Sequence, residues 1–279
     1  MGLMEVIYVI ILGIIEGITE WLPISSTGHL ILFEAIYPNL LSKSFSELFN
    51  VIIQLGAILS VIFLFHKDII PIKFENDEYT VKDKYILWSK VIVSCIPVVI
   101  VGLFFDDYFY NTFHNPFYVG LCLVLYGLVF ILLESFYKKD RNINSVLKIT
   151  YKSAFIIGLF QILALITGTS RSGVTMIGAS LLLFNRETTV KFSFIQAIPI
   201  MLGASILKLF KFMFNENITH NEIILLLIGT LTSFVVSLFV LRWLLEFVKR
   251  HNYNFFGFYR IILGLIVLSC IILGSISAS

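Results

Sequence analysis

Charged residues are scarce in this chain. They make up 14% of its 279 residues, whereas 58% are hydrophobic, and the mean hydropathy is +0.94. A soluble domain has roughly 25% charged and 45–50% apolar residues. The composition therefore excludes an ordinary soluble protein and predicts an all-α polytopic membrane protein. With a net charge of only +2, and with basic residues placed between apolar runs as topology signals, nucleic acid is not an expected partner.

Cysteine is also rare, and its three copies lie inside apolar segments without the spacing of metal ligands. We expect them to pack as small apolar side chains. A cleavable signal is not expected, because the N-terminus lacks a basic region and Glu5, Glu16 and Glu20 interrupt its apolar run. No soluble domain, low-complexity tract or long linker stands out, so we expect a single membrane domain over residues 1–279.

Six apolar runs approach or exceed the ~20 residues that a bilayer span requires. These predicted spans are residues 49–65, 85–105, 117–136, 190–210, 223–241 and 255–273. Two further apolar runs, residues 3–17 and 154–166, are too short. Each is followed by a polar break and a second short helix, which predicts two re-entrant helical hairpins. Such irregular backbone is tolerated at membrane depth only when it is buried in protein or lines a wet cavity.

Basic residues are concentrated in the segments 66–84, 137–152 and 242–251, which places these loops in the cytoplasm. The segments 106–115 and 215–222 contain no Lys or Arg and are predicted to lie outside. Three full spans follow each hairpin, so the second half enters the membrane with the opposite orientation. This parity predicts an inverted-topology repeat, with repeat one over 1–136 and repeat two over 151–276.

A weak sequence correspondence supports the repeat. Ser25 and Ser170 are 145 residues apart (170 − 25), and the same offset relates Gly28 to Gly173 and Glu16 to Gln161. The tripeptides I-I-Q at 52–54 and F-I-Q at 194–196 have a similar offset. Repeats of this kind place the site where the two hairpin tips converge.

Two polar stretches interrupt the apolar sequence at the predicted hairpin tips. They read E-G-I-T-E-W-L-P-I-S-S-T-G-H at 16–29 and G-T-S-R-S-G-V-T at 168–175. Each unsatisfied polar group at membrane depth costs several kcal/mol, so such clusters usually serve function. We predict that the two stretches meet and form one phosphate-handling site.

Glu16 and Glu20 are four residues apart and share one helical face. Two close carboxylates in a low dielectric repel each other unless one holds a proton or a hard cation binds both. Mg²⁺ and Ca²⁺ prefer such oxygen ligands, and Mg²⁺ also bridges phosphates. We therefore predict a divalent cation site; a protonated pair lining a wet groove is the alternative. Gly13 and Gly17, spaced G-x-x-x-G, indicate close helix packing.

Ser25, Ser26, Thr27 and Gly28 precede a predicted helix, where hydroxyls and free N–H groups cap the helix and bind anions. One hydroxyl is explained by capping, and three in a row leave one for chemistry or substrate. His29 follows directly. A general acid or base is the role predicted for it, with a hydrogen-bonded structural residue as the alternative.

Arg171 is the most informative single residue, because an arginine at hairpin depth requires an anionic partner. Its donor fork matches phosphate oxygens, and an ion pair with Glu16 or Glu20 is the alternative. Thr169, Ser170 and Ser172 surround it, and Gly173 opens a helix. One half then supplies carboxylates and histidine and the other the guanidinium, which is a clamp suited to phosphoryl transfer.

Both motifs, together with the run I-I-Q-L-G-A-I at 52–58, resemble those of bacterial undecaprenyl pyrophosphate phosphatases of the bacitracin-resistance type, and the resemblance covers essentially the whole chain. It implies hydrolysis of the C55 isoprenyl diphosphate to the monophosphate carrier of cell-wall synthesis. It also implies a divalent-cation requirement, the bacterial plasma membrane and a site open to the outer face. The family's functional motifs fall on Glu16, Glu20, Ser25, Ser26, Thr27, His29, Ser170, Arg171, Ser172 and Thr175. Thr167 replaces the family's usual proline.

The expected partners are a polyprenyl diphosphate lipid, the bilayer and a second copy of the chain. In the predicted reaction Ser26 or a water attacks the diphosphate, with His29 as base or acid. A carrier that moves an isoprenyl phosphate across the bilayer is the alternative function, because inverted repeats and broken helices are common in transporters. An ion channel is disfavoured, since the sequence has no ring of charge or filter-like loop.

Overall fold

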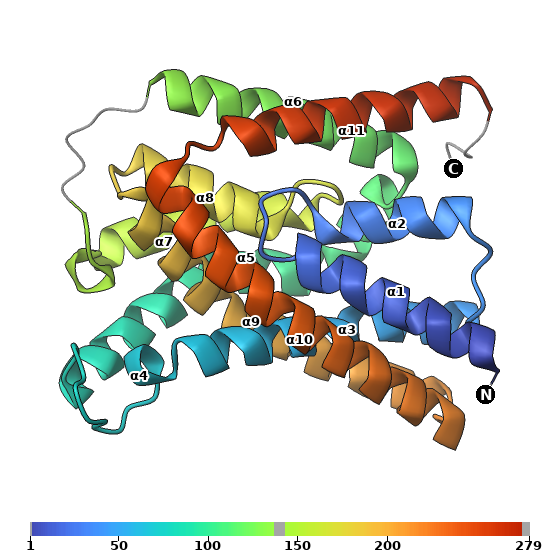
Figure 1. The fold of residues 1–279 in the computed structure, drawn as a ribbon, viewed down its shortest axis with the longest axis horizontal. Coiled ribbons are helices and arrows are strands. Elements are labelled where there is room, and N and C mark those ends of the chain that lie inside the picture. Colours follow the sequence, from blue (N-terminus) through green and yellow to red (C-terminus); the bar gives the residue numbers. More distant parts are fainter. Residues whose placement is uncertain (1, 137–142, 275–279) are drawn as a thin grey trace.

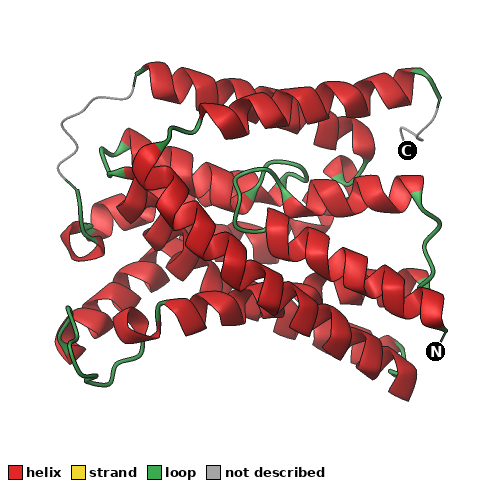
Figure 2. Ribbon diagram, in the orientation of Figure 1, coloured by secondary structure: helices red, strands yellow, loops and turns green. Residues whose placement is uncertain are grey.

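The computed structural model describes residues 2–136 and 143–274. Within these ranges the regular elements are helices, with one isolated bridge between Ile143 and Phe184 (Figure 2). The helices are α1 (Leu3–Thr19), α2 (Ser26–Ile36), α3 (Lys43–Leu64), α4 (His66–Ile69), α5 (Val81–Phe113), α6 (Pro116–Ser135), α7 (Tyr151–Ile162), α8 (Arg171–Leu181), α9 (Arg186–Asn215), α10 (His220–Arg250) and α11 (Asn254–Ile272), with short 3₁₀ turns at Val146–Lys148 and Leu163–Leu165.

Six of the described helices, α3, α5, α6, α9, α10 and α11, are long and apolar enough to cross a bilayer. The predicted all-α polytopic fold with six full spans is therefore confirmed. Two predicted loops are wrong. Helix α5 continues to Phe113 and α10 to Arg250, because polar residues extend a helix beyond its apolar stretch where water can solvate them. In α10 an ion pair between Arg250 and Glu246 at i,i+4 supports the last turn.

The two pairs of short helices each fold back on themselves, with their connections near the middle of the molecule (Figure 1). Helices α1 and α2 approach from one end and α7 and α8 from the other. The breaks, residues 20–25 and 163–170, thus meet between the long helices. That these hairpins are re-entrant, and that the halves form an inverted repeat, stay predictions.

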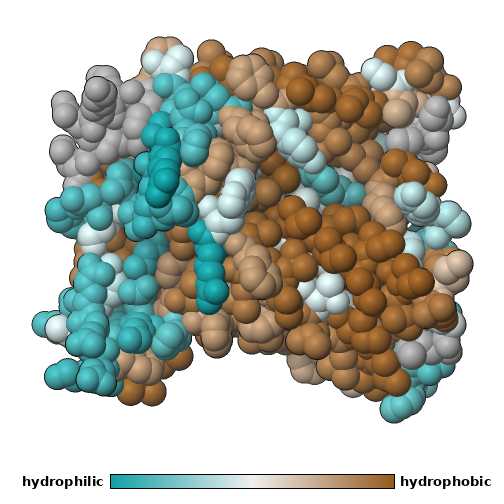
Figure 3. All heavy atoms as spheres, in the orientation of Figure 1, coloured by the Kyte–Doolittle hydropathy of each residue, from teal (hydrophilic) through white to brown (hydrophobic). Residues whose placement is uncertain are grey.

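The loops are divided between the two ends of the molecule. The segments 65–80, 143–150 and 251–253 lie at the left end of Figure 1, and the connections 37–42, 114–115 and 216–219 lie at the right. Figure 3 shows hydrophilic residues gathered at the left end and a broad apolar surface over the central helices. This division agrees with the grouping of basic and non-basic loops expected from the sequence.

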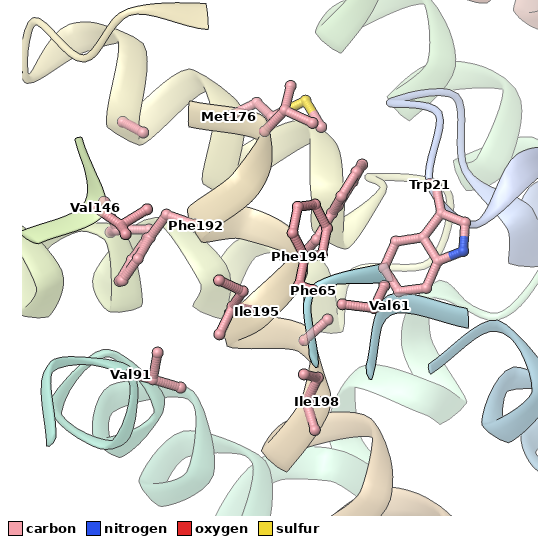
Figure 4. Close-up of a cluster of buried hydrophobic side chains, with 14 of the residues drawn as sticks. Trp21, Val61, Phe65, Val91, Val146, Met176, Phe192, Phe194, Ile195 and Ile198 are labelled. Atoms are coloured by element: carbon pink, nitrogen blue, oxygen red, sulfur yellow. The ribbon is translucent and has the colours of Figure 1, made fainter. Parts of the chain in front are cut away.

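Trp21 anchors the first break to the largest apolar cluster of the protein (Figure 4). The indole is fully buried and packs edge-on against Phe194 of α9, with ring centroids 4.9 Å apart. The Arg171 guanidinium also lies near the indole, 5.6 Å from its ring centroid. The apolar core therefore fixes the position of the first polar break, because Trp21 belongs to both.

Gly13 and Gly17 allow α1 to lie directly against α10. A Cβ added at Gly13 would come within 2.7 Å of the Gly229 carbonyl oxygen, and one at Gly17 within 2.9 Å of the Ser233 carbonyl oxygen. Small residues at this spacing let helix backbones approach closely in apolar surroundings. The predicted close packing is confirmed, and it holds the end of α1, with Glu16, in the interior.

Candidate functional site

The two breaks have the same local construction. Ser25 caps α2 with φ 74°, and Ser170 caps α8 with φ 71°. Each serine Oγ accepts a hydrogen bond from the glycine N–H three residues later, at 3.3 Å for Gly28 and 3.2 Å for Gly173. A left-handed backbone at a residue other than glycine costs of order 1–3 kcal/mol and is typical of functional sites. The strained caps aim two helix N-termini, which favour anions, at the centre of the molecule.

Arg171 and Glu20 join the two breaks. The Arg171 Nη2 lies 2.7 Å from Glu20 Oε1, and the two side chains are 12% and 8% exposed. A second donor of the same guanidinium, Nη1, reaches the Ser193 carbonyl oxygen at 3.3 Å. The predicted meeting of the two polar stretches is therefore confirmed, and of the two carboxylates considered as a partner for Arg171, Glu20 is the one in contact.

Glu16 lies behind Glu20 and is fully buried. Neither of its carboxylate oxygens accepts a hydrogen bond from a donor, and its interacting neighbour is the Glu20 carboxylate. A shared proton or a bound cation would each relieve this arrangement. In residues 2–136 and 143–274 no three His, Cys, Asp or Glu side chains are grouped to hold a metal. Two carboxylates nevertheless fit Mg²⁺, which keeps waters and takes substrate phosphates as further ligands.

Ser26 donates a hydrogen bond to Glu20, with 2.5 Å between Oγ and Oε2. Both Glu20 oxygens are thus engaged, one with the guanidinium and one with the hydroxyl. A charge-assisted hydrogen bond of this length is strong and directs the hydroxyl proton toward the carboxylate. The serine oxygen lone pairs remain available to a reacting group.

A cavity of about 230 Å³ lies at this meeting point. Of the predicted site residues, those that line it are Glu20, Ser25, Ser26, Thr27, Ser170 and Arg171. A second cavity of about 700 Å³ is lined in part by Glu34, Asn50, Tyr110, His114 and Lys208, and shares Thr27, Gln54 and Thr167 with the first. The shared residues place the two cavities side by side.

The remaining predicted substrate-binding residues support the breaks and do not line either cavity. Ser172 Oγ lies within hydrogen-bond distance of the Glu20 and Leu22 carbonyl oxygens, at 3.2 and 3.3 Å. Thr169 and Thr175 are fully buried. At Gly28 and Gly173 an added Cβ would crowd the capping serine, with Oγ at 3.1 and 3.3 Å.

His29 lies outside the lining of both cavities. Its Nδ1 is 2.7 Å from the Ser25 carbonyl oxygen, and its Nε2 is 2.8 Å from the Tyr259 hydroxyl. Both ring nitrogens are therefore engaged within the protein. The sequence did not suggest Tyr259 as a partner, since nothing in an aromatic residue of an apolar helix marks a contact across 230 positions. General acid or base duty for His29 stays a prediction.

Arg260 is a residue of the site that our sequence reasoning missed. It is fully buried on α11 and donates to carbonyl oxygens of both breaks, at 2.9 Å to Pro23, 3.0 Å to Gly168 and 3.2 Å to Thr169. The signal was present, because an arginine within an apolar span is expected to have a specific internal partner. Arg260 therefore ties the two breaks together from the side.

These features define a polytopic helical membrane protein with an internal polar cavity, in which a guanidinium, hydroxyls and two helix N-termini can hold an anion beside paired carboxylates. The chain belongs to the family described as bacitracin resistance protein BacA, whose model matches residues 9–266. The resemblance inferred from the motifs is thereby confirmed.

Close relatives have similar length. The chain is 47% identical over 267 residues to an undecaprenyl-diphosphatase of Enterococcus faecalis, covering 95% of this chain and 96% of the relative. It is 48% identical over 268 residues to one of Lachnoclostridium phytofermentans, covering 96% and 97%. It is also 46% identical over 267 residues to one of Streptococcus mutans serotype c, covering 95% of each chain.

Proposed function

We propose that this protein is an integral membrane phosphatase that hydrolyses undecaprenyl diphosphate to undecaprenyl phosphate and inorganic phosphate. Relatives that match along almost their whole length carry the name undecaprenyl-diphosphatase. The observation that carries the proposal is the contact of Arg171 with Glu20 at 2.7 Å on the wall of a cavity between two helix N-termini. A bare lipid carrier has no evident need for this carboxylate, hydroxyl and guanidinium set.

The geometry supports a phosphoryl transfer with Ser26 as the nucleophile. Its Oγ forms a bond to the terminal phosphorus while the bond from that phosphorus to the bridging oxygen breaks, and the lipid monophosphate leaves. Glu20, already hydrogen-bonded to this hydroxyl, accepts the proton. Arg171 stabilises charge on the transferring group. Water then cleaves the phosphoserine and restores the hydroxyl. In the alternative, water attacks directly and Ser26 binds an equatorial oxygen.

Two groups complete the proposed site. Glu16 and Glu20 would hold Mg²⁺ or Ca²⁺, which when bound neutralises negative charge on the phosphate oxygens. His29 is proposed to protonate the leaving oxygen or to act as a base. For either role its ring must exchange one of its present partners, the Ser25 carbonyl or the Tyr259 hydroxyl, for a substrate or water molecule.

The surface supports a proposed path for the substrate and a proposed orientation of the site. The isoprenyl tail is proposed to lie between helices in the bacterial plasma membrane, against the apolar surface of Figure 3. The larger cavity includes Leu41, Asn111 and His114, which belong to the end of the molecule whose connections are poor in Lys and Arg. This supports a site open to the outer face. A homodimer stays a prediction.

Removal of divalent cations tests the proposed reaction. We expect purified protein to release phosphate from undecaprenyl diphosphate, to stop when a chelator is added, and to recover with Mg²⁺ or Ca²⁺. Glu16→Gln should lower the rate about a hundredfold, in the range for loss of one electrostatic group in a transition state. Glu246→Gln, on the exposed end of α10, is the control and should keep full activity. Lipid transport without phosphate release would favour the carrier instead.

The nucleophile is tested by Ser26→Ala. If Ser26 attacks, we expect phosphate release to fall about a thousandfold or more, because no other hydroxyl of the described residues is hydrogen-bonded to the Glu20 carboxylate. A phosphoserine should then be trapped by acid quench in the parent protein. Ser60→Ala, a buried serine of α3 that bonds within its own helix, should be active. A Ser26→Ala protein with near-full rate would assign the attack to water.

A further inference from the structure

Gln161 is a buried amide that makes no hydrogen bond within the protein. It lies at the smaller of the two cavities, the one lined by Glu20, Ser26 and Arg171, which we call the reaction cavity. It lies on α7, is 1% exposed, and lines the cavity of about 230 Å³. Neither its Nε2 nor its Oε1 has a partner in the protein. Buried polar groups in native structures are almost always satisfied, and one that is not calls for an explanation such as a ligand or bound water.

Gln54 on α3 supplies a second amide to the same cavity. It is half-buried and lines both the reaction cavity and the larger cavity next to it. A third glutamine, Gln196, serves as the comparison: it is fully buried and lines neither cavity, and its Nε2 donates to the Ser94 carbonyl oxygen at 3.3 Å while its Oε1 has no partner in the protein. Two of these three glutamines therefore face the cavities.

The chemistry of the cavity identifies what the amides would bind. The Arg171 guanidinium lines it and brings positive charge and N–H donors, and Ser26 and Ser170 line it as well. Gln161 occupies the position 145 residues after Glu16 (161 − 16), and so the second half carries a neutral donor where the first half has a carboxylate. An amide N–H binds a phosphate oxygen without adding charge, which permits a product to be bound and then released.

We propose that Gln161 and Gln54 bind the phosphate group that leaves as orthophosphate. Gln161 holds it within the reaction cavity, and Gln54 receives it at the junction with the larger cavity, beside Thr27 and Thr167. The assignment rests on the proposed phosphatase function and adds to it a product site made of neutral amides, distinct from the carboxylates and the guanidinium.

Product inhibition and direct binding test the assignment. In Gln161→Leu and Gln54→Leu we expect the inhibition constant of inorganic phosphate to rise about tenfold each, as for loss of one hydrogen bond to a charged group. Titration of each protein with inorganic phosphate in the absence of substrate, followed by ³¹P NMR, should show the same tenfold weakening of phosphate binding. Gln196→Leu should leave both values unchanged, which makes it the matched control.

An isosteric variant guards against a folding artefact. Gln161→Glu keeps the shape of the side chain and adds a negative charge, so it should weaken phosphate binding more than Gln161→Leu does. Unchanged phosphate binding in Gln161→Leu, Gln161→Glu and Gln54→Leu, with an active parent protein, would overturn the amide site and leave the phosphatase intact. A parent protein that neither binds phosphate nor releases it would instead refute the proposed function.

Discussion

Arg171→Lys is expected to lower the rate of phosphate release about a hundredfold or more, as for loss of one donor to a transition state, while leaving the protein folded. Lysine keeps the charge and can still reach Glu20, so an exclusively structural ion pair would be rescued. The Arg171 guanidinium is a planar fork that contacts both Glu20, at 2.7 Å, and the Ser193 carbonyl oxygen. Lysine has no such fork and cannot bind two phosphate oxygens in parallel. Steady-state phosphate release, with kcat and KM determined separately, measures the effect.

Two further variants distinguish a catalytic role of Arg171 from a structural one. Arg171→Met removes the charge and leaves Glu20 without its cationic partner, and we expect a further loss of activity together with a lower midpoint of thermal unfolding. Arg186→Lys changes a comparable pair, with 2.7 Å between Arg186 and Glu134, away from both cavities, and should remain active. If Arg171→Lys retained wild-type kcat and KM, Arg171 would be a structural cation and the proposed clamp would be wrong.

The sequence was sufficient to predict the spans and the meeting of the two breaks. Length and hydropathy determine how many helices cross an apolar layer, and polar groups at membrane depth must find each other because water is not there to satisfy them. The same logic correctly indicated that Arg171 has an acidic partner. Helix ends were less predictable: residues 106–113 and 242–250 are helical in the structure, since polar residues are compatible with either a loop or a solvated helix.

Within the site, the sequence identified residue types but not the direction of each side chain. Ser26 and Ser172 belong to similar motifs, yet Ser26 lines the cavity while Ser172 lies beside main-chain carbonyls of the opposite break. His29 likewise lies near Tyr259. The direction in which each of these side chains points depends on how elements distant in sequence pack together. The local spacing of residues does not encode this packing. Arg260 shows the same point, because its acceptors are carbonyl oxygens that exist at every position.

Arg260→Met is expected to lower both stability and activity strongly. The guanidinium is fully buried, and none of the ion pairs among the described residues involves it. Its charge is instead stabilised by carbonyl oxygens, which include Pro23 in the first break, and Gly168 and Thr169 in the second. Replacing a buried ion pair by apolar residues can be neutral when both partners are replaced. Here the acceptors are main chain and remain, each losing a donor at a cost of about 1–3 kcal/mol.

The effect of Arg260→Met on stability should appear as a lower midpoint of thermal unfolding in detergent. Its effect on activity should appear as a reduced kcat, because the Arg260 contacts hold the two breaks at the separation that lets Arg171 reach Glu20. Arg260 is thus a positioning residue, and Arg260→Lys, which can donate to some of the same carbonyls, should recover part of both quantities. Arg242→Met, on the exposed surface of α10, is the control and should change neither. An Arg260→Met protein with parental stability and kcat would show that the two breaks are held by the apolar core around Trp21 alone.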